Sequence, residues 1–243
     1  MKVTIKHYYD FQPNKVNIGP ALDTAQGWDS LRVDQPDADD FFAIPADREQ
    51  WRQKARRNPL WVREARDILA FADGKFRRIC SCGVGAGYLE FLIKDADPSM
   101  EMVCSDYTPR AIERLGTVFP EAERLYCFDM LNGDWPRDEQ NSLHLLYRVD
   151  TIFDDVQWRH VAGRMHAAGV EHVLFVPCEF LGWQRFAAQS IKYFRSRLLN
   201  RPVTFAGYLR TASALERLFS GFYSVRRKVP VGGMAGYYLI RNS

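Results

Sequence analysis

The sequence predicts an α/β fold: a doubly wound, mostly parallel sheet with helices on both faces. Apolar runs of strand length alternate with helical patterns from residue 77 to residue 177, and this alternation is typical of parallel sheets. A glycine-rich turn follows the first run and opens a helical pattern, with Gly83, Gly85 and Gly87 at alternate positions. Asp106 ends the second run, nineteen residues after Gly87.

The elements can be placed in chain order. A helical pattern covers 48–72 and should break at Asn58 and Pro59, because proline removes a backbone donor. Strands are expected at 77–82, 101–106, 124–129, 142–149 and 172–177. Helices are expected between them at 88–94, 109–118 and 154–168. Apolar residues recur in steps of three and four from Phe180 to Leu198, which indicates a long amphipathic helix within an insertion at 179–206.

Residues 1–50 are predicted to form an arm, and residues 51–243 the core domain with its insertion. Prolines, glycines and aspartates interrupt any period in the arm, although residues 3–6 could form a short strand. The arm also carries scattered aromatic residues, which a solvated linker would lack. We therefore expect it to pack on the core, either over a binding site or over a sheet edge.

The glycine turn and Asp106 together predict a nucleotide-like ligand. Glycines permit a tight turn and close backbone approach, and free N–H groups at a helix start bind polar ligand groups. A carboxylate at the end of the second strand is placed to hold both hydroxyls of a ribose. Tyr88 occupies the third glycine position of the dinucleotide fingerprint, which disfavours a nicotinamide oxidoreductase.

In the form G-x-G-x-G, the turn resembles that of the class I S-adenosylmethionine-dependent methyltransferases. Further segments resemble the family's later strands in the right order, namely 105–115, 125–130, 144–150, 172–177, 223–229 and 236–241. The resemblance covers about residues 60–243. It implies a seven-stranded sheet closed by an antiparallel hairpin of the last two strands.

The resemblance also implies S-adenosyl-L-methionine as the cofactor and a set of residues around it. Asp106 would bind the ribose, Tyr107 would pack beside the adenine, and Asp129 would accept a hydrogen bond from the adenine amino group. The family usually has an acidic residue at the position of Ser81, where it helps to organise the methionine end of the cofactor. The cofactor-binding candidates are Ser81, Gly83, Gly85, Gly87, Asp106, Tyr107, Asp129 and Met130, the last through its backbone.

The loop after the fourth strand supplies the catalytic candidates, Asp150 and Arg148. Methyl transfer is an in-line displacement that depends mainly on positioning, and a general base helps when the acceptor is a hydroxyl. Asp150 could be that base or could orient the acceptor, but Asp150 or Asp154 could instead cap the following helix. Arg148 could bind an acceptor carboxylate or phosphate, or it could only pair with Asp150.

The predicted function is methyl transfer to a small-molecule or glycan-like acceptor, most simply on oxygen. Residues 180–215 contain six lysines and arginines and no acidic residue. One alternative is therefore a protein or RNA methyltransferase that docks through this basic segment, and another is a catalytically silent cofactor-binding protein. The helix could pack its apolar stripe inward, or it could face an anionic or lipid-linked acceptor or a membrane surface. A pI near 8.6 is too low to predict a stable nucleic-acid partner.

The composition is that of an ordinary globular protein, with 47% hydrophobic and 26% charged residues. The odd number of cysteines, five, and their placement mostly in expected strands predict reduced, buried thiols. No cysteine–histidine cluster has metal-binding spacing, so we expect no metal. No signal-peptide pattern and no membrane-spanning run are visible, so a cytoplasmic location is expected.

Overall fold

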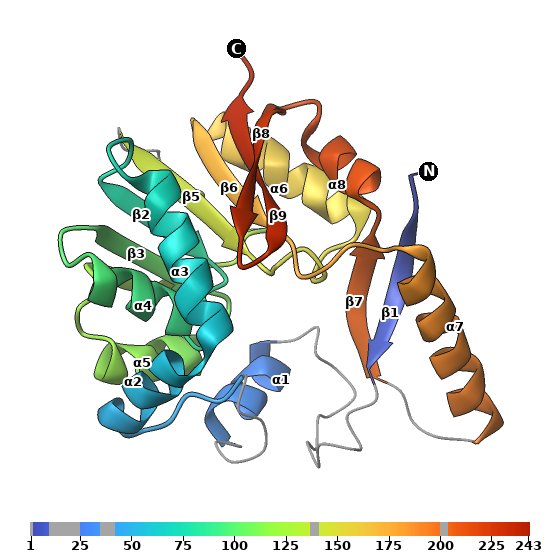
Figure 1. Ribbon diagram of the computed structural model, residues 1–243, viewed down its shortest axis with the longest axis horizontal. Helices are drawn as coiled ribbons and strands as arrows, with labels where there is room; N and C mark the ends of the chain where they lie inside the picture. Colours follow the sequence, from blue (N-terminus) through green and yellow to red (C-terminus); the bar gives the residue numbers. More distant parts are fainter. Residues whose placement is uncertain (1, 10–24, 35–41, 137–140, 200–203) are drawn as a thin grey trace.

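A computed structural model describes residues 2–9, 25–34, 42–136, 141–199 and 204–243 (Figure 1). Its main sheet has seven strands. From one edge to the other these are β4 (Arg124–Cys127), β3 (Glu101–Asp106), β2 (Arg78–Cys82), β5 (Ser142–Tyr147), β6 (His172–Val176), β9 (Met234–Arg241) and β8 (Tyr223–Val231). The first five strands are parallel, whereas β9 pairs antiparallel with both β6 and β8. The predicted seven-stranded, doubly wound sheet with its closing hairpin is confirmed.

Helices cover both faces of this sheet. One face carries α2 (Arg48–Arg57), α3 (Pro59–Ala72), α4 (Tyr88–Ala96) and α5 (Pro109–Val118), and the other carries α6 (Asp155–Ala167) and α8 (Ala212–Phe219). The helix is interrupted between α2 and α3 as expected. The Asn58 side chain accepts hydrogen bonds from the backbone amides of Leu60 and Trp61 and so begins a new helix. Sequence analysis did not predict α8.

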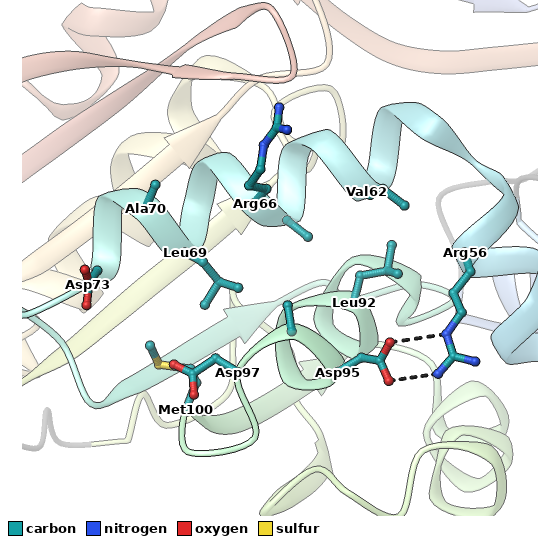
Figure 2. A pocket seen from close by; sticks show the side chains of 12 residues that line it. Arg56, Val62, Arg66, Leu69, Ala70, Asp73, Leu92, Asp95, Asp97 and Met100 are labelled. Atoms are coloured by element: carbon teal, nitrogen blue, oxygen red, sulfur yellow. Dashed lines mark hydrogen bonds and ion pairs between the residues drawn. The ribbon is translucent and has the colours of Figure 1, made fainter.

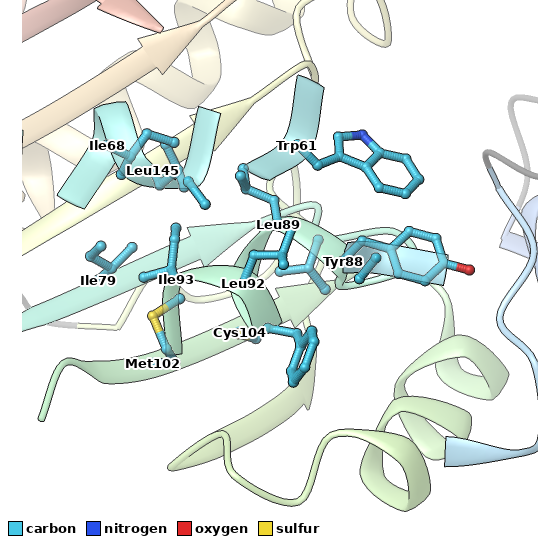
Figure 3. Close-up of a cluster of buried hydrophobic side chains, with 14 of the residues drawn as sticks. Trp61, Ile68, Ile79, Tyr88, Leu89, Leu92, Ile93, Met102, Cys104 and Leu145 are labelled. Carbon is cyan, nitrogen blue, oxygen red and sulfur yellow. The ribbon is translucent and has the colours of Figure 1, made fainter. Parts of the chain in front are cut away.

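Each face has its own apolar core. Figure 3 shows part of the first, where Ile79 of β2, Met102 of β3 and Leu145 of β5 pack against Leu89 and Ile93 of α4. The second centres on Trp158 of α6, whose ring lies edge-on to Phe175 of β6. Strands buried on both faces fix the edge at which their carboxyl ends meet, and that edge positions the candidate site.

A second, two-stranded sheet lies apart from the main one (Figure 1). Strand β1 (Thr4–Tyr9) pairs antiparallel with β7 (Thr204–Arg210), so the arm joins the insertion. Strand β7 begins at Thr204, inside the insertion expected at 179–206. Helix α7 (Trp183–Leu198) covers most of the expected apolar stripe from Phe180 to Leu198. Arm segments 10–24 and 35–41 lie outside the described residues.

The cysteines are reduced, but not all are buried. Cys82 and Cys104 lie in the core, Cys80 and Cys178 are half-buried, and Cys127 is exposed. The prediction of burial was wrong for Cys127, because β4 is an edge strand and its last residue faces solvent.

Candidate functional site

The glycine turn between β2 and α4 adopts a backbone that only glycine fits well. Gly83 and Gly87 have φ of +78° and +69°, values that disfavour residues with a Cβ. A Cβ on Gly83 would lie 2.5 Å from Cγ1 of Val149, and one on Gly87 would lie 2.8 Å from Cδ2 of Leu115. Neighbouring side chains therefore leave no room for a Cβ at Gly83 or Gly87.

Asp106, at the carboxyl end of β3, faces this turn. Its Oδ2 accepts from the Gly85 amide at 2.8 Å, and its Oδ1 accepts from the Thr108 amide and hydroxyl at 3.1 and 2.6 Å. The side chain is buried, with 3% exposed. Asp106 thus lies next to the glycine turn, as the sequence analysis expected. Hydrogen bonds from Gly85 and Thr108 hold its carboxylate in place.

Arg32, from the arm, occupies the remaining side of this carboxylate. Its guanidinium donates to Asp106 Oδ1 at 2.6 Å and to the Thr108 hydroxyl at 2.8 Å, and it lies beside Gly85. A carboxylate offers about four lone-pair sites, and Arg32, Gly85 and the two Thr108 donors make four hydrogen bonds to it. Three of these donors share Oδ1, whereas Oδ2 accepts only from Gly85. A ribose hydroxyl that bound to Oδ1 would therefore displace one of the three, and Arg32 is the one that comes from outside the core.

The arm segment that carries Arg32 is docked on α5. It comprises α1 (Ala25–Asp29) and the π-helical turn η2 (Ser30–Asp34). Asp29 accepts from the Ala111 amide at 3.0 Å in the first turn of α5, and Asp34 pairs with Arg110 at 2.5 Å. Carboxylates are favoured at a helix N-terminus. The arm therefore packs over the site, one of the two placements that the sequence left open.

Tyr88 explains the departure from the dinucleotide pattern. It is buried, and its hydroxyl donates to the carbonyl of Ala43 in the arm at 2.5 Å. Its ring stacks on Trp61 of α3 with centroids 4.7 Å apart. A glycine here would leave a hole between α3, α4 and the arm.

The other adenosine-side candidates lie around the same edge. Tyr107 is 45% exposed, directly after Asp106. Met130 is buried, with its Cε 4.0 Å from the place of a Cβ on Gly83. Asp129 caps its own turn, accepting from the Leu131 amide and the Asn132 side chain, each at 2.8 Å. The structure thus gathers these residues, and their assigned roles stay predictions.

Ser81 is paired with a buried carboxyl group that the sequence analysis overlooked. Its hydroxyl lies 2.7 Å from Oε1 of Glu90, in the first turn of α4. Glu90 is 2% exposed, and burial raises the pKa of its carboxyl to about 7. An acidic group therefore lies beside Ser81 although Ser81 itself is neutral. The signal available in the sequence was a glutamate nine residues on, within the otherwise apolar run 88–93.

Glu90→Gln should stabilise the protein at neutral and alkaline pH. The folded-state pKa is raised above the unfolded value, so the stability tied to the protonated form is complete below about pH 4.5 and is lost as pH rises through about 7. Glutamine carries no such penalty, and a shift of this size corresponds to about 3 kcal/mol. Urea unfolding from about pH 4 to pH 8 measures the difference between variant and wild type. A difference that does not grow with pH would contradict the assignment.

Arg148 pairs with Glu64 rather than with Asp150. Its guanidinium donates to Oε1 of Glu64 at 2.9 Å, and Tyr147 donates to Oε2 of the same residue at 2.5 Å. Glu64 is fully buried, and a buried carboxylate requires such partners. The pairing with Asp150 that the sequence analysis considered was wrong, because the Arg148 side chain turns toward α3.

Asp150 lies buried between the carboxyl ends of β5 and β6. Its Oδ1 accepts from the Cys178 amide at 2.6 Å, and burial raises the pKa of its carboxyl to about 6. Asp154, not Asp150, caps α6 and forms a capping box with Gln157. The alternative in which Asp150 is the cap was therefore wrong, and its catalytic role stays a prediction.

A buried arginine fixes the loop that carries Asp150. Arg210, at the end of β7, is 1% exposed and donates to the carbonyls of Asp150 and Phe153, each at 2.5 Å. It also donates to Asp155 at 2.8 Å, and Thr4 of β1 hydrogen-bonds the same carboxylate. Arg210 thus differs from Arg185 and Arg195, which belong to the same basic stretch of sequence and are exposed.

A surface groove of about 740 Å³ lies elsewhere, between α3 and α4 (Figure 2). It is lined by Val62, Leu69, Leu92 and Met100, among others, and the Arg56–Asp95 pair closes one end. Met100 precedes β3, at the end of that strand opposite Asp106. None of the predicted site residues lines this groove, so we place the site at the carboxyl edge, where the polar groups converge.

Within the described ranges, no three or more His, Cys, Asp or Glu side chains are grouped so that they could hold a metal ion. Among the helices described, none combines the length and the apolar composition that crossing a bilayer needs.

Comparison with known proteins places the fold. No family model and no curated protein matches the sequence. The structure is similar to human N-acetylserotonin methyltransferase in complex with S-adenosylmethionine, with a TM-score of 0.57 and 20% identity over 81% of this chain and 56% of that one. The chain has the class I methyltransferase fold.

Two other solved structures share this methyltransferase fold. The pyocyanin biosynthetic protein PhzM gives a TM-score of 0.53 and 19% identity over 78% of this chain and 61% of that one. A putative O-methyltransferase from Nostoc punctiforme gives 0.53 and 19% over 79% of this chain and 60% of that one. The chain thus spans 56–61% of the length of these three proteins.

Proposed function

We propose that this protein is an S-adenosylmethionine-dependent methyltransferase that acts on a small-molecule acceptor. The observation that carries the proposal is the pairing of Asp106 with the Gly83–Gly87 turn at the carboxyl edge of a methyltransferase fold. The turn leaves room only for backbone, and the carboxylate is held to face it. This donor and acceptor set fits an adenosine with a ribose diol.

In this proposal each residue of the site binds or orients. Asp106 accepts from the ribose hydroxyls, Tyr107 offers an exposed ring beside the adenine, and the glycine turn admits the methionine portion closely. The cofactor supplies a methyl group on a sulfonium, which is already activated for displacement. The protein then needs to hold the acceptor in line and exclude water.

We propose O-methylation, with Asp150 as the group that orients or deprotonates an acceptor hydroxyl. Two observations support this role: Asp150 lies at the carboxyl end of β5, and the raised pKa of its carboxyl, about 6, is close to neutral. The small-molecule acceptor is supported by the neighbours, since one is named for N-acetylserotonin and another for pyocyanin biosynthesis. The ion pair with Glu64 favours a structural role for Arg148.

Thermal unfolding with separate ligands tests the proposal. S-adenosylhomocysteine or S-adenosylmethionine at about a hundred times its dissociation constant should add about 2.7 kcal/mol, which raises the midpoint by roughly 5–11 °C for a chain of this size. NAD serves as the control and should give no shift. A midpoint shift with NAD alone would refute the proposal, and so would the absence of a shift with all three ligands. Binding without methyl transfer to any acceptor in a broad screen would instead indicate a silent cofactor-binding protein.

Arg32→Met should tighten cofactor binding. Arg32 competes with the ribose for Asp106, so its removal increases the fraction of protein that is ready to bind. We expect the dissociation constant for S-adenosylhomocysteine to fall about tenfold, since one charge-assisted hydrogen bond is worth about 1.5–3 kcal/mol. Isothermal titration calorimetry measures it. Weaker binding in the variant would show that Arg32 contacts the ligand instead of competing with it.

A further inference from the structure

Helix α7 presents its apolar side to solvent. Trp183, Ile191, Phe194 and Leu198 are 78%, 66%, 64% and 85% exposed. Their spacing of eight, three and four residues puts them on one stripe of the helix. The alternative in which this stripe packs inward was therefore wrong. Four large exposed apolar side chains on one helix face are uncommon in a soluble domain and mark an interaction surface.

The helix packs on the protein through its more polar side. In Figure 1, α7 lies beside β1 at the outer edge of the molecule, away from the main sheet. Gln189, Ser190 and Tyr193 are half-buried, whereas the apolar stripe is not. An ordinary amphipathic helix has the opposite arrangement. Covering the stripe therefore requires something outside the described chain.

The charge around the stripe indicates what covers it. Residues 180–215 contain no acidic residue, and α7 carries Arg185, Lys192, Arg195 and Arg197. Arg185 is neutralised by Glu179 at 2.5 Å, whereas Arg195 is exposed beside the stripe. An unbalanced positive charge next to exposed Trp, Phe and Leu matches an anionic bilayer surface, where such helices lie in the plane of the interface.

The same charge disfavours a second copy of the chain as the occupant. Pairing α7 with α7 would bring together two basic helices, because residues 183–198 contain four lysines and arginines and no carboxylate to oppose them. Like charges brought together in a partly desolvated interface are costly. Anionic headgroups would neutralise these cations while the acyl chains cover the stripe.

We propose that α7 is an in-plane membrane-docking helix whose Trp183–Phe194–Leu198 stripe inserts into the surface of an anionic bilayer. This proposal is independent of methyl transfer. Docking places the membrane on the side of β1 and β7, and β7 contacts the loop after β5 through a hydrogen bond from the Tyr208 amide to the Thr151 carbonyl at 2.8 Å.

Flotation of the full chain with lipid vesicles tests the proposal. The wild type should float with vesicles of phosphatidylcholine mixed with phosphatidylserine, and much less with phosphatidylcholine alone. The apolar variant, with Trp183→Ser, Phe194→Ser and Leu198→Ser, should remain in the aqueous fraction. The charge variant, with Lys192→Gln, Arg195→Gln and Arg197→Gln, should partition on the order of 100-fold more weakly. Rising salt should weaken wild-type binding.

A matched control separates this helix from exposed apolar residues in general. Val62, Val156 and Val225 are 43%, 77% and 38% exposed on three other elements. Their joint replacement by serine should leave flotation unchanged. The apolar variant should unfold at the wild-type midpoint, because Trp183, Phe194 and Leu198 are exposed. The unfolding midpoint of the charge variant is measured before its flotation is compared with that of the wild type.

Three outcomes would overturn the proposal. The first is a wild type that does not float with anionic vesicles, and the second is an apolar variant that floats as the wild type does. The third is a wild type that does not bind vesicles but forms a dimer or binds single-stranded RNA, when the apolar variant loses that dimer or that RNA binding. That result would make the stripe a protein or RNA interface.

Discussion

Asp106→Ala is expected to abolish measurable binding of S-adenosylhomocysteine. The carboxylate is the only side chain of the described site that both faces the glycine turn and is held there by backbone amides. Losing two charge-assisted hydrogen bonds to a ribose, each worth about 1.5–3 kcal/mol, weakens binding by at least about 100-fold. Isothermal titration calorimetry at micromolar protein would then show no heat of binding.

The matched control for this variant is Asp95→Ala. Asp95 is also a paired carboxylate, but it lies on α4 at the end of the distant groove (Figure 2). Its replacement should leave binding unchanged. Since Asp106 also holds the Gly85 and Thr108 amides, unfolding midpoints must be compared first, and binding read only below the lower midpoint. Binding by Asp106→Ala within severalfold of the wild type would show that the ligand lies elsewhere.

Arg210→Met is expected to cost about 3–5 kcal/mol of unfolding free energy, as is typical when one partner of a buried ion pair is removed. The guanidinium is almost fully buried and has three acceptors: the carbonyls of Asp150 and Phe153 and the carboxylate of Asp155. Methionine fills similar space but donates nothing, so these acceptors lose their partner. Urea unfolding measures the loss.

Arg66→Met provides the comparison for Arg210. The Arg66 side chain is 75% exposed and lies 3.9 Å from Asp67, so its replacement should change the unfolding free energy by less than about 0.5 kcal/mol. Equal effects of the two variants would mean that Arg210 does not hold the loop after β5. Because that loop carries Asp150, we also expect Arg210→Met to impair methyl transfer more than cofactor binding.

The parallel core could be predicted because its signals are local. Four strands are buried on both faces and appear in the sequence as short apolar runs, namely β2, β3, β5 and β6. Three glycines at alternate positions likewise predict a tight turn without reference to distant residues. Helix α8 was missed because its eight residues are too few to establish a period. The break before Pro59 was found because proline and the Asn58 cap act within one turn.

The site divides in the same way. Asp106 and the glycines were found from spacing alone, since a strand end and the following turn determine which way each residue points. Glu90 could have been suspected as a charge within the apolar run 88–93. Arg32 had no local signal at all, because its partner lies 74 residues away along the chain. Only the docking of η2 on α5 brings the two together.

The sequence by itself determined the sheet, the glycine turn, the Asp106 carboxylate and the period of α7, because each follows from contacts between near neighbours. Tertiary structure decided which groups those elements meet. It put Arg32 on Asp106, paired Arg148 with Glu64, joined β1 to β7 and left the α7 stripe facing outward. Period shows that a helix has an apolar side, but the packing of distant segments decides whether that side is covered.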